Sequence, residues 1–128
     1  MSIQLNHTIV PARDKHASAE FLAGILGIPT SPDVARFAPV TISNGVTLDY
    51  MNLADKPPQH YAFLVSEDTF DAVFARITAA GLRYHADPNG DLPGEIYHSR
   101  TGGRGVYFPD PDGHLMEILT RDLTGRVI

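Results

Sequence analysis

The sequence predicts an α+β fold made of two tandem βαβββ modules, and three observations support this prediction. The segments 45–52 and 113–120 share one pattern, in which a glycine, three residues and a carboxylate precede apolar residues at strand spacing. A strand-like run upstream of each segment carries a histidine, His7 in the first and His60 in the second. A helical pattern that stops at a glycine follows each histidine. The chain therefore has the pattern of a duplicated unit.

Length and composition suit one globular domain over residues 1–128, with module one at 1–54 and module two at 59–122. The net charge is −5 without a run of like charges, which argues against a nucleic-acid partner. The absence of cysteine excludes a disulfide scaffold, a thiolate metal site and a cysteine nucleophile. No apolar stretch reaches membrane-spanning length and residues 1–20 hold no signal-peptide core, so a cytoplasmic protein without membrane contact is expected.

Module one begins with a strand in which alternation places Leu5, His7 and Ile9 on one face. An apolar stripe at helical spacing then predicts a helix from the N-cap Asp14 to Leu26. Two further strands are predicted at 34–42 and 46–53, joined by a turn at Ser43-Asn44-Gly45. A linker-like segment from Ala54 to Pro58 follows at the boundary of the duplication.

Module two repeats this order with a strand at 60–65 and a helix that Ser66 caps and Gly81 ends. The last strands are predicted at 82–85, 106–109 and 114–120. The segment 86–104 between them is long and rich in glycine. Loops of this length are often functional, so we interpret it as a flexible wall or lid of a pocket, with a disordered surface excursion as the alternative.

Four ionisable residues occupy matching places in the two modules: His7, Asp49, His60 and Glu117. Alternation sets each of them in an otherwise apolar row, and a strand that is apolar on both faces is covered on both. A buried carboxylate is costly unless it is paired or bound to a metal. Two imidazoles with one or two carboxylates form a ligand set for a catalytic divalent metal, so we predict that the four residues share one ion.

Each of these residues also has an ordinary interpretation. A single histidine in a strand is more often a hydrogen-bonded core or edge residue than a ligand. Glu117 alone could pair with Arg100 or Arg104, and Asp49 alone could be a carboxylate near a turn. The metal prediction therefore depends on the repeat, because chance rarely brings all four residues into register.

The paired modules, their histidines and the ending Gly105-Val-Tyr-Phe-Pro-Asp-Pro-Asp-Gly-His-Leu-Met-Glu-Ile-Leu resemble the vicinal oxygen chelate superfamily over nearly the whole chain. This superfamily includes glyoxalase I, fosfomycin-resistance enzymes, methylmalonyl-CoA epimerase, bleomycin-resistance proteins and extradiol dioxygenases. The resemblance implies a cupped, mostly antiparallel eight-stranded sheet with one helix per module outside and a divalent metal at the bottom. It also implies a homodimer, as do the sheet edges left unpaired.

The resemblance assigns the metal ligands by position to His7, His60 and Glu117, with Asp49 in the fourth place. Bacterial glyoxalase I uses four protein ligands, whereas fosfomycin-resistance enzymes and extradiol dioxygenases use three. Asp49 is one methylene shorter than the glutamate of glyoxalase I, so it could bind the metal directly, act through a water or serve as a base. Zinc, iron, manganese, nickel and cobalt all suit such a site.

The function implied is a metal-dependent enzyme whose small-molecule substrate chelates the ion through two adjacent oxygens. A glyoxalase-type isomerase or lyase and a fosfomycin-resistance-type thiol transferase are the leading possibilities. A protein that sequesters a ligand or drug, as in bleomycin resistance, is the alternative from another class. An extradiol dioxygenase is expected less, because those enzymes usually need longer, four-module chains.

Glu117 or Asp49 could move the proton at the metal's edge, which makes both candidate catalytic groups. Four residues in or beside the long segment are candidate substrate contacts, each with a solvent-facing loop position as the alternative: His98, Arg100, Arg104 and Tyr107. His114 differs from Glu117 in strand parity, so we interpret it as a turn residue or a support for the ligands.

Overall fold

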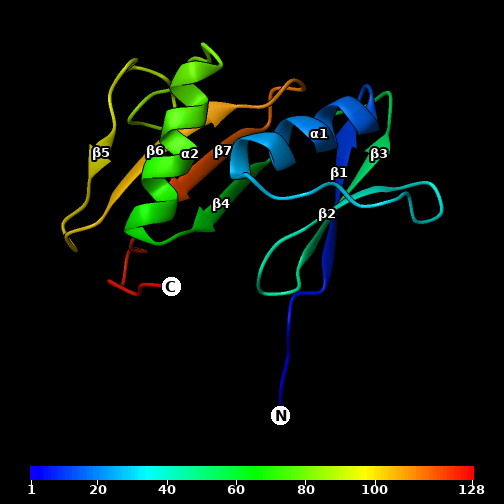
Figure 1. The fold of residues 1–128 in the computed structure, drawn as a ribbon, viewed down its shortest axis with the longest axis horizontal. Coiled ribbons are helices and arrows are strands. Elements are labelled where there is room, and N and C mark those ends of the chain that lie inside the picture. Colours follow the sequence, from blue (N-terminus) through cyan, green and yellow to red (C-terminus); the bar gives the residue numbers. More distant parts are fainter. The chain divides into compact units, whose positions relative to one another are not determined.

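The computed structural model describes all residues from 1 to 128 and contains two helices and seven strands (Figure 1). It divides into two compact units, unit 1 at Met1–Pro57 and unit 2 at Pro58–Ile128. The division falls within the linker-like segment from Ala54 to Pro58. The mixed α+β class with its repeated order of elements confirms the predicted fold class. No helix has the length and apolar character needed to cross a membrane.

Unit 1 contains a three-stranded sheet in the order β1-β3-β2, with β1 and β3 parallel and β2 and β3 antiparallel. Its elements are β1 (His7–Ala12), α1 (Lys15–Leu26), β2 (Ala38–Thr41) and β3 (Thr47–Asn52). The turn between β2 and β3 forms where Asn44-Gly45 predicts it. Gly45 adopts a φ of 85°, a conformation that glycine accepts without steric cost, and its N–H donates to the Ile42 carbonyl at 2.9 Å.

Helix α1 begins where the Asp14 carboxylate accepts hydrogen bonds from the backbone N–H groups of His16 and Ala17. It ends at Gly27. Its buried residues include Leu22 and Ile25, whereas Ala17, an apolar residue of its first turn, is exposed. The core of unit 1 is formed by side chains from the helix and from one face of the sheet: Val10, Ala12, Ala19, Leu22, Ala23, Ile25, Ala38, Val40, Leu48 and Tyr50.

Unit 2 contains a four-stranded sheet in the order β4-β7-β6-β5. Its elements are β4 (His60–Leu64), α2 (Glu67–Ala79), β5 (Tyr97–His98), β6 (Arg104–Pro109) and β7 (Leu115–Leu119). Strands β4 and β7 are parallel, and the other neighbours are antiparallel. Ser66 caps α2 by accepting from the Thr69 N–H at 3.2 Å. The core is formed by residues of α2 and of one sheet face: Phe63, Val65, Phe70, Val73, Ile77, Val106, Phe108, Met116 and Ile118.

The strand register shows the same relationship between histidine and carboxylate in both units. In unit 1, Ile9 pairs with Asp49, and in unit 2, Ala62 pairs with Glu117. The residue two positions after the histidine therefore faces the carboxylate across a parallel pair in each unit. Because side chains alternate along a strand and paired residues share a face, histidine and carboxylate lie on one side of each sheet.

Four details differ from the sequence-based expectation. The predicted strand at 82–85 is reduced to an isolated bridge, in which His85 exchanges backbone hydrogen bonds of 2.9 Å with Tyr107. This bridge and β5 share the edge of β6. The chain has seven strands rather than eight, and they form two sheets, one in each unit, rather than one. The predicted strand at 34–42 is only β2, because the chain turns at Val34–Phe37, and Leu5 lies outside β1.

Candidate active site

The sheet face of unit 2 that is turned away from its core carries an open cleft of about 1000 Å³. Side chains from four strands line it together with parts of the segment 86–104 and of the C-terminal segment. The lining residues are His60, Ala62, Ala86, Tyr97, His98, Ser99, Arg100, Thr101, Tyr107, Glu117, Leu119, Arg121, Asp122, Leu123 and Thr124. The prediction that part of the long segment forms a pocket wall agrees with this lining.

His60 and Glu117 lie together in this cleft. The His60 Nε2 atom is 2.9 Å from Glu117 Oε1, and the two residues come from the neighbouring parallel strands β4 and β7. Their side chains differ in exposure, since His60 is 47% exposed and Glu117 only 8%. The pair thus places a buried carboxylate beneath an accessible imidazole.

Tyr97 binds the second oxygen of the same carboxylate. Its hydroxyl donates to Glu117 Oε2 at 2.6 Å. Tyr97 lies on the edge strand β5 opposite Gly105 of β6, and a Cβ at position 105 would overlap the Tyr97 ring and hydroxyl. The missing side chain at Gly105 therefore lets the tyrosine reach across β6 to β7.

Tyr107 stands at the centre of the aromatic groups around Glu117. It pairs with Glu117 in the register of β6 and β7, and its ring centroid is 5.7 Å from Tyr97 and 5.8 Å from His60. The His85 ring stacks on it at 6.0 Å. Burial, followed by the charge of Glu117 and a hydrogen bond to it, raises the pKa of Tyr107, so its hydroxyl keeps its proton at neutral pH.

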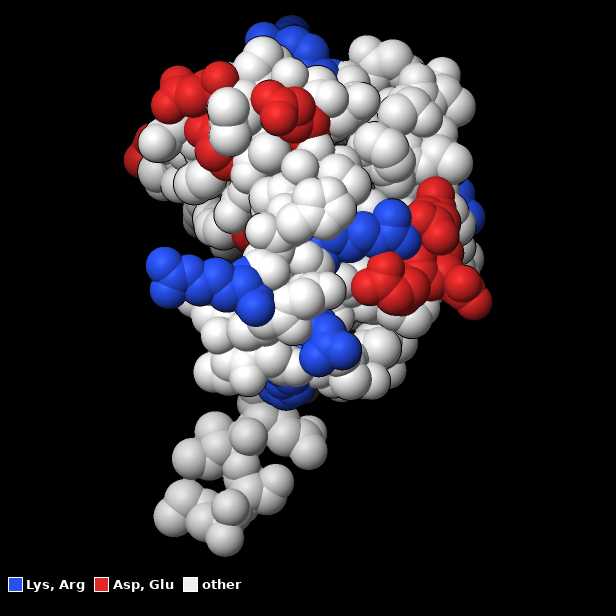
Figure 2. Space-filling view, turned by 90° about the vertical axis from the view of Figure 1, so that its left-hand side faces the viewer, with Lys and Arg blue, Asp and Glu red and all other residues white.

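The remaining predicted contacts of the cleft are His98 and Arg100, and the structure adds Arg121. Both His98 and Arg100 are exposed, as is Arg121. Figure 2 shows basic and acidic side chains interspersed on one side of the molecule, some of them in direct contact, with no continuous basic surface. Two guanidinium groups in the lining favour a polar or negatively charged group on whatever the cleft binds.

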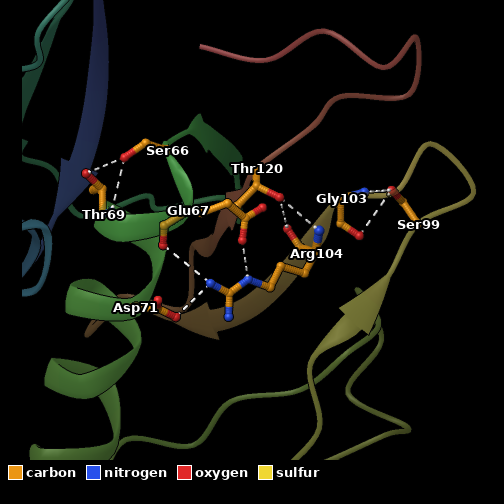
Figure 3. Close-up of polar contacts among 8 residues, drawn as sticks. All are labelled: Ser66, Glu67, Thr69, Asp71, Ser99, Gly103, Arg104 and Thr120. Carbon is orange, nitrogen blue, oxygen red and sulfur yellow. Dashed lines mark hydrogen bonds and ion pairs between the residues drawn. The ribbon is translucent and has the colours of Figure 1, made fainter.

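Arg104 lies elsewhere, because residues 104 and 107 have opposite parity on β6. Its Nε donates to Glu67 Oε1 at 2.7 Å and its Nη2 to Asp71 Oδ1 at 2.6 Å, as Figure 3 shows. The guanidinium also lies 4.3 Å from the centre of the Phe70 ring. Arg104 thus ties β6 to the first turns of α2 and is absent from the cleft lining.

His7 and Asp49 lie in unit 1 and do not meet as the second pair does. His7 is exposed and its Nδ1 is 2.8 Å from Asn6 Oδ1, while Asp49 is half-buried. Neither unit contains a group of three or more histidine or carboxylate residues that could hold a metal ion. Unit 2 supplies two potential ligand atoms, His60 Nε2 and Glu117 Oε1. Their 2.9 Å separation suits neighbouring ligands that each lie about 2.0–2.2 Å from one ion.

The turn between β6 and β7 fixes the start of the histidine strand. The fully buried His114 accepts a hydrogen bond from the Gln59 N–H through Nδ1 at 3.1 Å. The Asp110 carboxylate closes the turn by accepting from the N–H groups of Asp112 and His114. Burial raises the pKa of Asp110. Of the two interpretations of His114, a turn residue or a support for the ligands, this geometry agrees with the first.

The segment 86–104 contains two hydrogen-bonded turns and a short strand and is not a disordered excursion. The Asp87 carboxylate accepts from the backbone N–H groups of Asn89, Asp91 and Leu92, and the Asp91 contact is the largest cause of its lowered pKa. Further along, the Ser99 hydroxyl and the backbone of Gly103 close a second turn (Figure 3). Strand β5 lies between the two turns.

Tyr97 contacts Glu117 directly, and sequence reasoning missed it. It lies within a segment predicted to be irregular, where no periodicity marks it. A signal was present in Gly105, a glycine that begins the final motif and lies two residues before Tyr107 in β6. A small residue within a strand marks a place where another group approaches closely, but the sequence does not say which group.

Comparison with known proteins places the chain in a family. The profile of the Glyoxalase/Bleomycin resistance protein/Dioxygenase superfamily matches residues 4–118. The chain belongs to this superfamily. The resemblance to vicinal oxygen chelate proteins predicted from the two modules is thereby confirmed.

Two solved structures are similar to nearly the whole chain. Oxidase ChaP-H2 is 61% identical with a TM-score of 0.92, covering 95% of this chain and 96% of that one. Oxidase ChaP-H1 is 51% identical with a TM-score of 0.89, covering 94% and 98%. Among curated proteins, the metallothiol transferase FosB of Shouchella clausii (strain KSM-K16) is 41% identical over 68 residues. That match spans 53% of this chain and 42% of the transferase.

Proposed function

We propose that this chain is a metal-dependent oxidase of a small molecule, with the reaction in the cleft of unit 2. The His60–Glu117 pair carries the metal part of the proposal, because it brings an imidazole nitrogen and a carboxylate oxygen within 2.9 Å in the cleft. His7 and Asp49 remain proposed ligands because they occupy the register positions of this pair in unit 1. An oxidase is favoured by the 61% identity to Oxidase ChaP-H2 over 95% of the chain.

A divalent, redox-active ion such as iron or manganese would bind two adjacent substrate oxygens and allow electrons to pass from the substrate to dioxygen. The chain's own groups have separate tasks. His60 and Glu117 would hold the ion, and Glu117 is also a candidate proton acceptor at its carboxylate. Tyr107 offers a protonated hydroxyl to a substrate oxygen that gains negative charge. His98, Arg100 and Arg121 supply polar contacts at the cleft wall.

A thiol transferase is the second candidate, favoured by the 41% identity to the metallothiol transferase FosB. A glyoxalase-type isomerase or lyase and a ligand-sequestering protein, both predicted as possibilities from the sequence, belong to the same test. The enzymes require a bound ion, whereas the sequestering protein does not.

The test is metal analysis of protein purified without chelator, followed by oxygen uptake with compounds that carry two adjacent oxygens. We expect about one divalent ion per chain and oxygen consumption that the His60→Ala variant loses together with the metal. Thiol consumption without oxygen uptake would identify the transferase. A parent protein without metal that still binds small molecules in the cleft would exclude all three enzymes and favour the sequestering protein.

A further inference from the structure

We propose that Tyr97 is a positioning residue. Its hydrogen bond to Oε2 orients the Glu117 carboxylate so that only the other oxygen, Oε1, points to His60. This inference rests on the proposed metal-dependent function of the same site. Tyr97 fixes the orientation of the proposed metal ligand Glu117, and Gly105 makes room for the Tyr97 ring.

The two oxygens of Glu117 have different partners. Oε1 accepts from His60 and Oε2 from the Tyr97 hydroxyl, and the whole residue is only 6% exposed. The Tyr97 contact of 2.6 Å lies within the range of charge-assisted hydrogen bonds between a hydroxyl and a carboxylate, which are stronger than neutral ones. Rotation of the carboxylate would break both bonds, so the contact fixes its orientation.

Gly105 is required by space, and its backbone conformation is one that other residues could adopt. Eight glycines of the chain have a positive φ, and Gly105 is not among them. The Tyr97 ring and hydroxyl occupy the place of a Cβ at this position. A larger residue here would push Tyr97 away from Glu117 without straining β6 itself, because the overlapping atoms are at the end of a side chain.

A neighbouring ring helps to keep Tyr97 in this position. The Tyr107 ring lies 5.7 Å from that of Tyr97 and limits its movement on the cleft side. A carboxylate held in this way would offer one oxygen, Oε1, to an ion.

Cobalt(II) binding to the full-length protein tests the proposal, because its visible absorption spectrum reports the coordination number. We expect Tyr97→Phe to weaken cobalt affinity about 10- to 100-fold, as loss of a group that orients a ligand does. Its cobalt spectrum should also change, since the released carboxylate can bind through both oxygens. Tyr84→Phe removes the same atom from a ring that packs on Phe74 outside the cleft, and it should match the parent.

A readout without metal accompanies the titration. The Tyr97 hydroxyl proton should give a low-field proton NMR resonance in the metal-free parent, because it is held in a short hydrogen bond to a carboxylate. This resonance should be absent from Tyr97→Phe and present in Tyr84→Phe.

Gly105→Ala tests whether Tyr97 needs the space that the missing side chain at position 105 leaves. It should weaken cobalt binding in the same direction as Tyr97→Phe, and the double variant should lose much less than the sum of the two effects, because both remove one contact. Gly24→Ala is the matched control, since a Cβ on this helical glycine meets nothing within 4 Å. If Gly105→Ala does not fold, Tyr97→Phe decides the matter alone.

If the parent binds no cobalt, the proposed function fails and the inference fails with it. If the parent binds cobalt but Tyr97→Phe binds it as tightly with the same spectrum, only the inference is overturned.

Discussion

His114 accepts a hydrogen bond from the backbone N–H of Gln59, so the turn before β7 holds the start of β4. The next residue of β4 is His60, whose Nε2 atom reaches Glu117 on β7. One buried imidazole thus joins the starts of β4 and β7. The two residues in contact are 55 positions apart in the sequence. This contact positions the histidine of the site through the backbone that precedes it.

We expect His114→Ala to lower the free energy of unfolding by about 2–4 kcal/mol, because it leaves a cavity and an unpaired N–H group. Urea unfolding followed by circular dichroism measures the change. His16→Ala is the control, since this exposed histidine pairs only with the half-exposed Asp33 and should cost less than about 0.5 kcal/mol. An unchanged midpoint for His114→Ala would show that the Gln59 contact is unimportant.

The ion pairs of Arg104 with Glu67 and Asp71 predict that stability depends on pH. The hydrogen bond from Arg104 is the largest cause that lowers the pKa of Glu67 below its ordinary value of 4.5. A carboxylate whose pKa is lower in the folded state adds stability above its unfolded pKa and loses it as the pH falls through the folded pKa. Glu67→Gln should therefore be less stable than the parent at pH 7, and the difference should shrink below about pH 4.5.

Asp68→Asn is the control for this experiment. It removes a charge from the same first turn of α2, so both variants lose a similar interaction with the helix dipole. Urea unfolding at several pH values should show a smaller dependence for Asp68→Asn than for Glu67→Gln. Equal curves would assign the effect to the helix dipole and exclude the Arg104 pair.

The role of Asp49 follows from comparing it with Glu117. If both residues bind the metal, Asp49→Asn and Glu117→Gln should each weaken its affinity, which competition with a chelating dye measures. If Asp49 is a base, Asp49→Asn should keep the affinity of the parent and lose turnover. We expect weaker metal binding in both, because the two carboxylates share one register position in the repeat.

We expect a homodimer in solution. Each sheet is open and leaves two edge strands, β1 and β2 in unit 1 and β4 and β5 in unit 2. Unpaired strand edges are commonly covered by another chain or element, and the family resemblance favours a second copy. Sedimentation velocity at micromolar concentration measures the mass, and a single monomeric species would contradict the prediction.

The sequence by itself determined the features that depend on near neighbours. Alternation set the faces of β4 and β7, Asp14 and Ser66 marked the helix starts, and Asn44-Gly45 marked the turn. The repeat also placed His60 and Glu117 correctly on one face. These signals are local because caps, turns and side-chain alternation depend on residues a few positions apart.

Only the tertiary structure decided the contacts between distant segments. Tyr97 reaches Glu117 across 20 residues of chain because Gly105 leaves space between them. Strand β6 begins at Arg104, two residues before the start that its apolar pattern predicts. Side-chain alternation therefore extends to Arg104 and directs its guanidinium towards α2. Strand length and edge pairing depend on which segments compete for the same backbone groups, and a single sequence does not reveal the outcome of that competition.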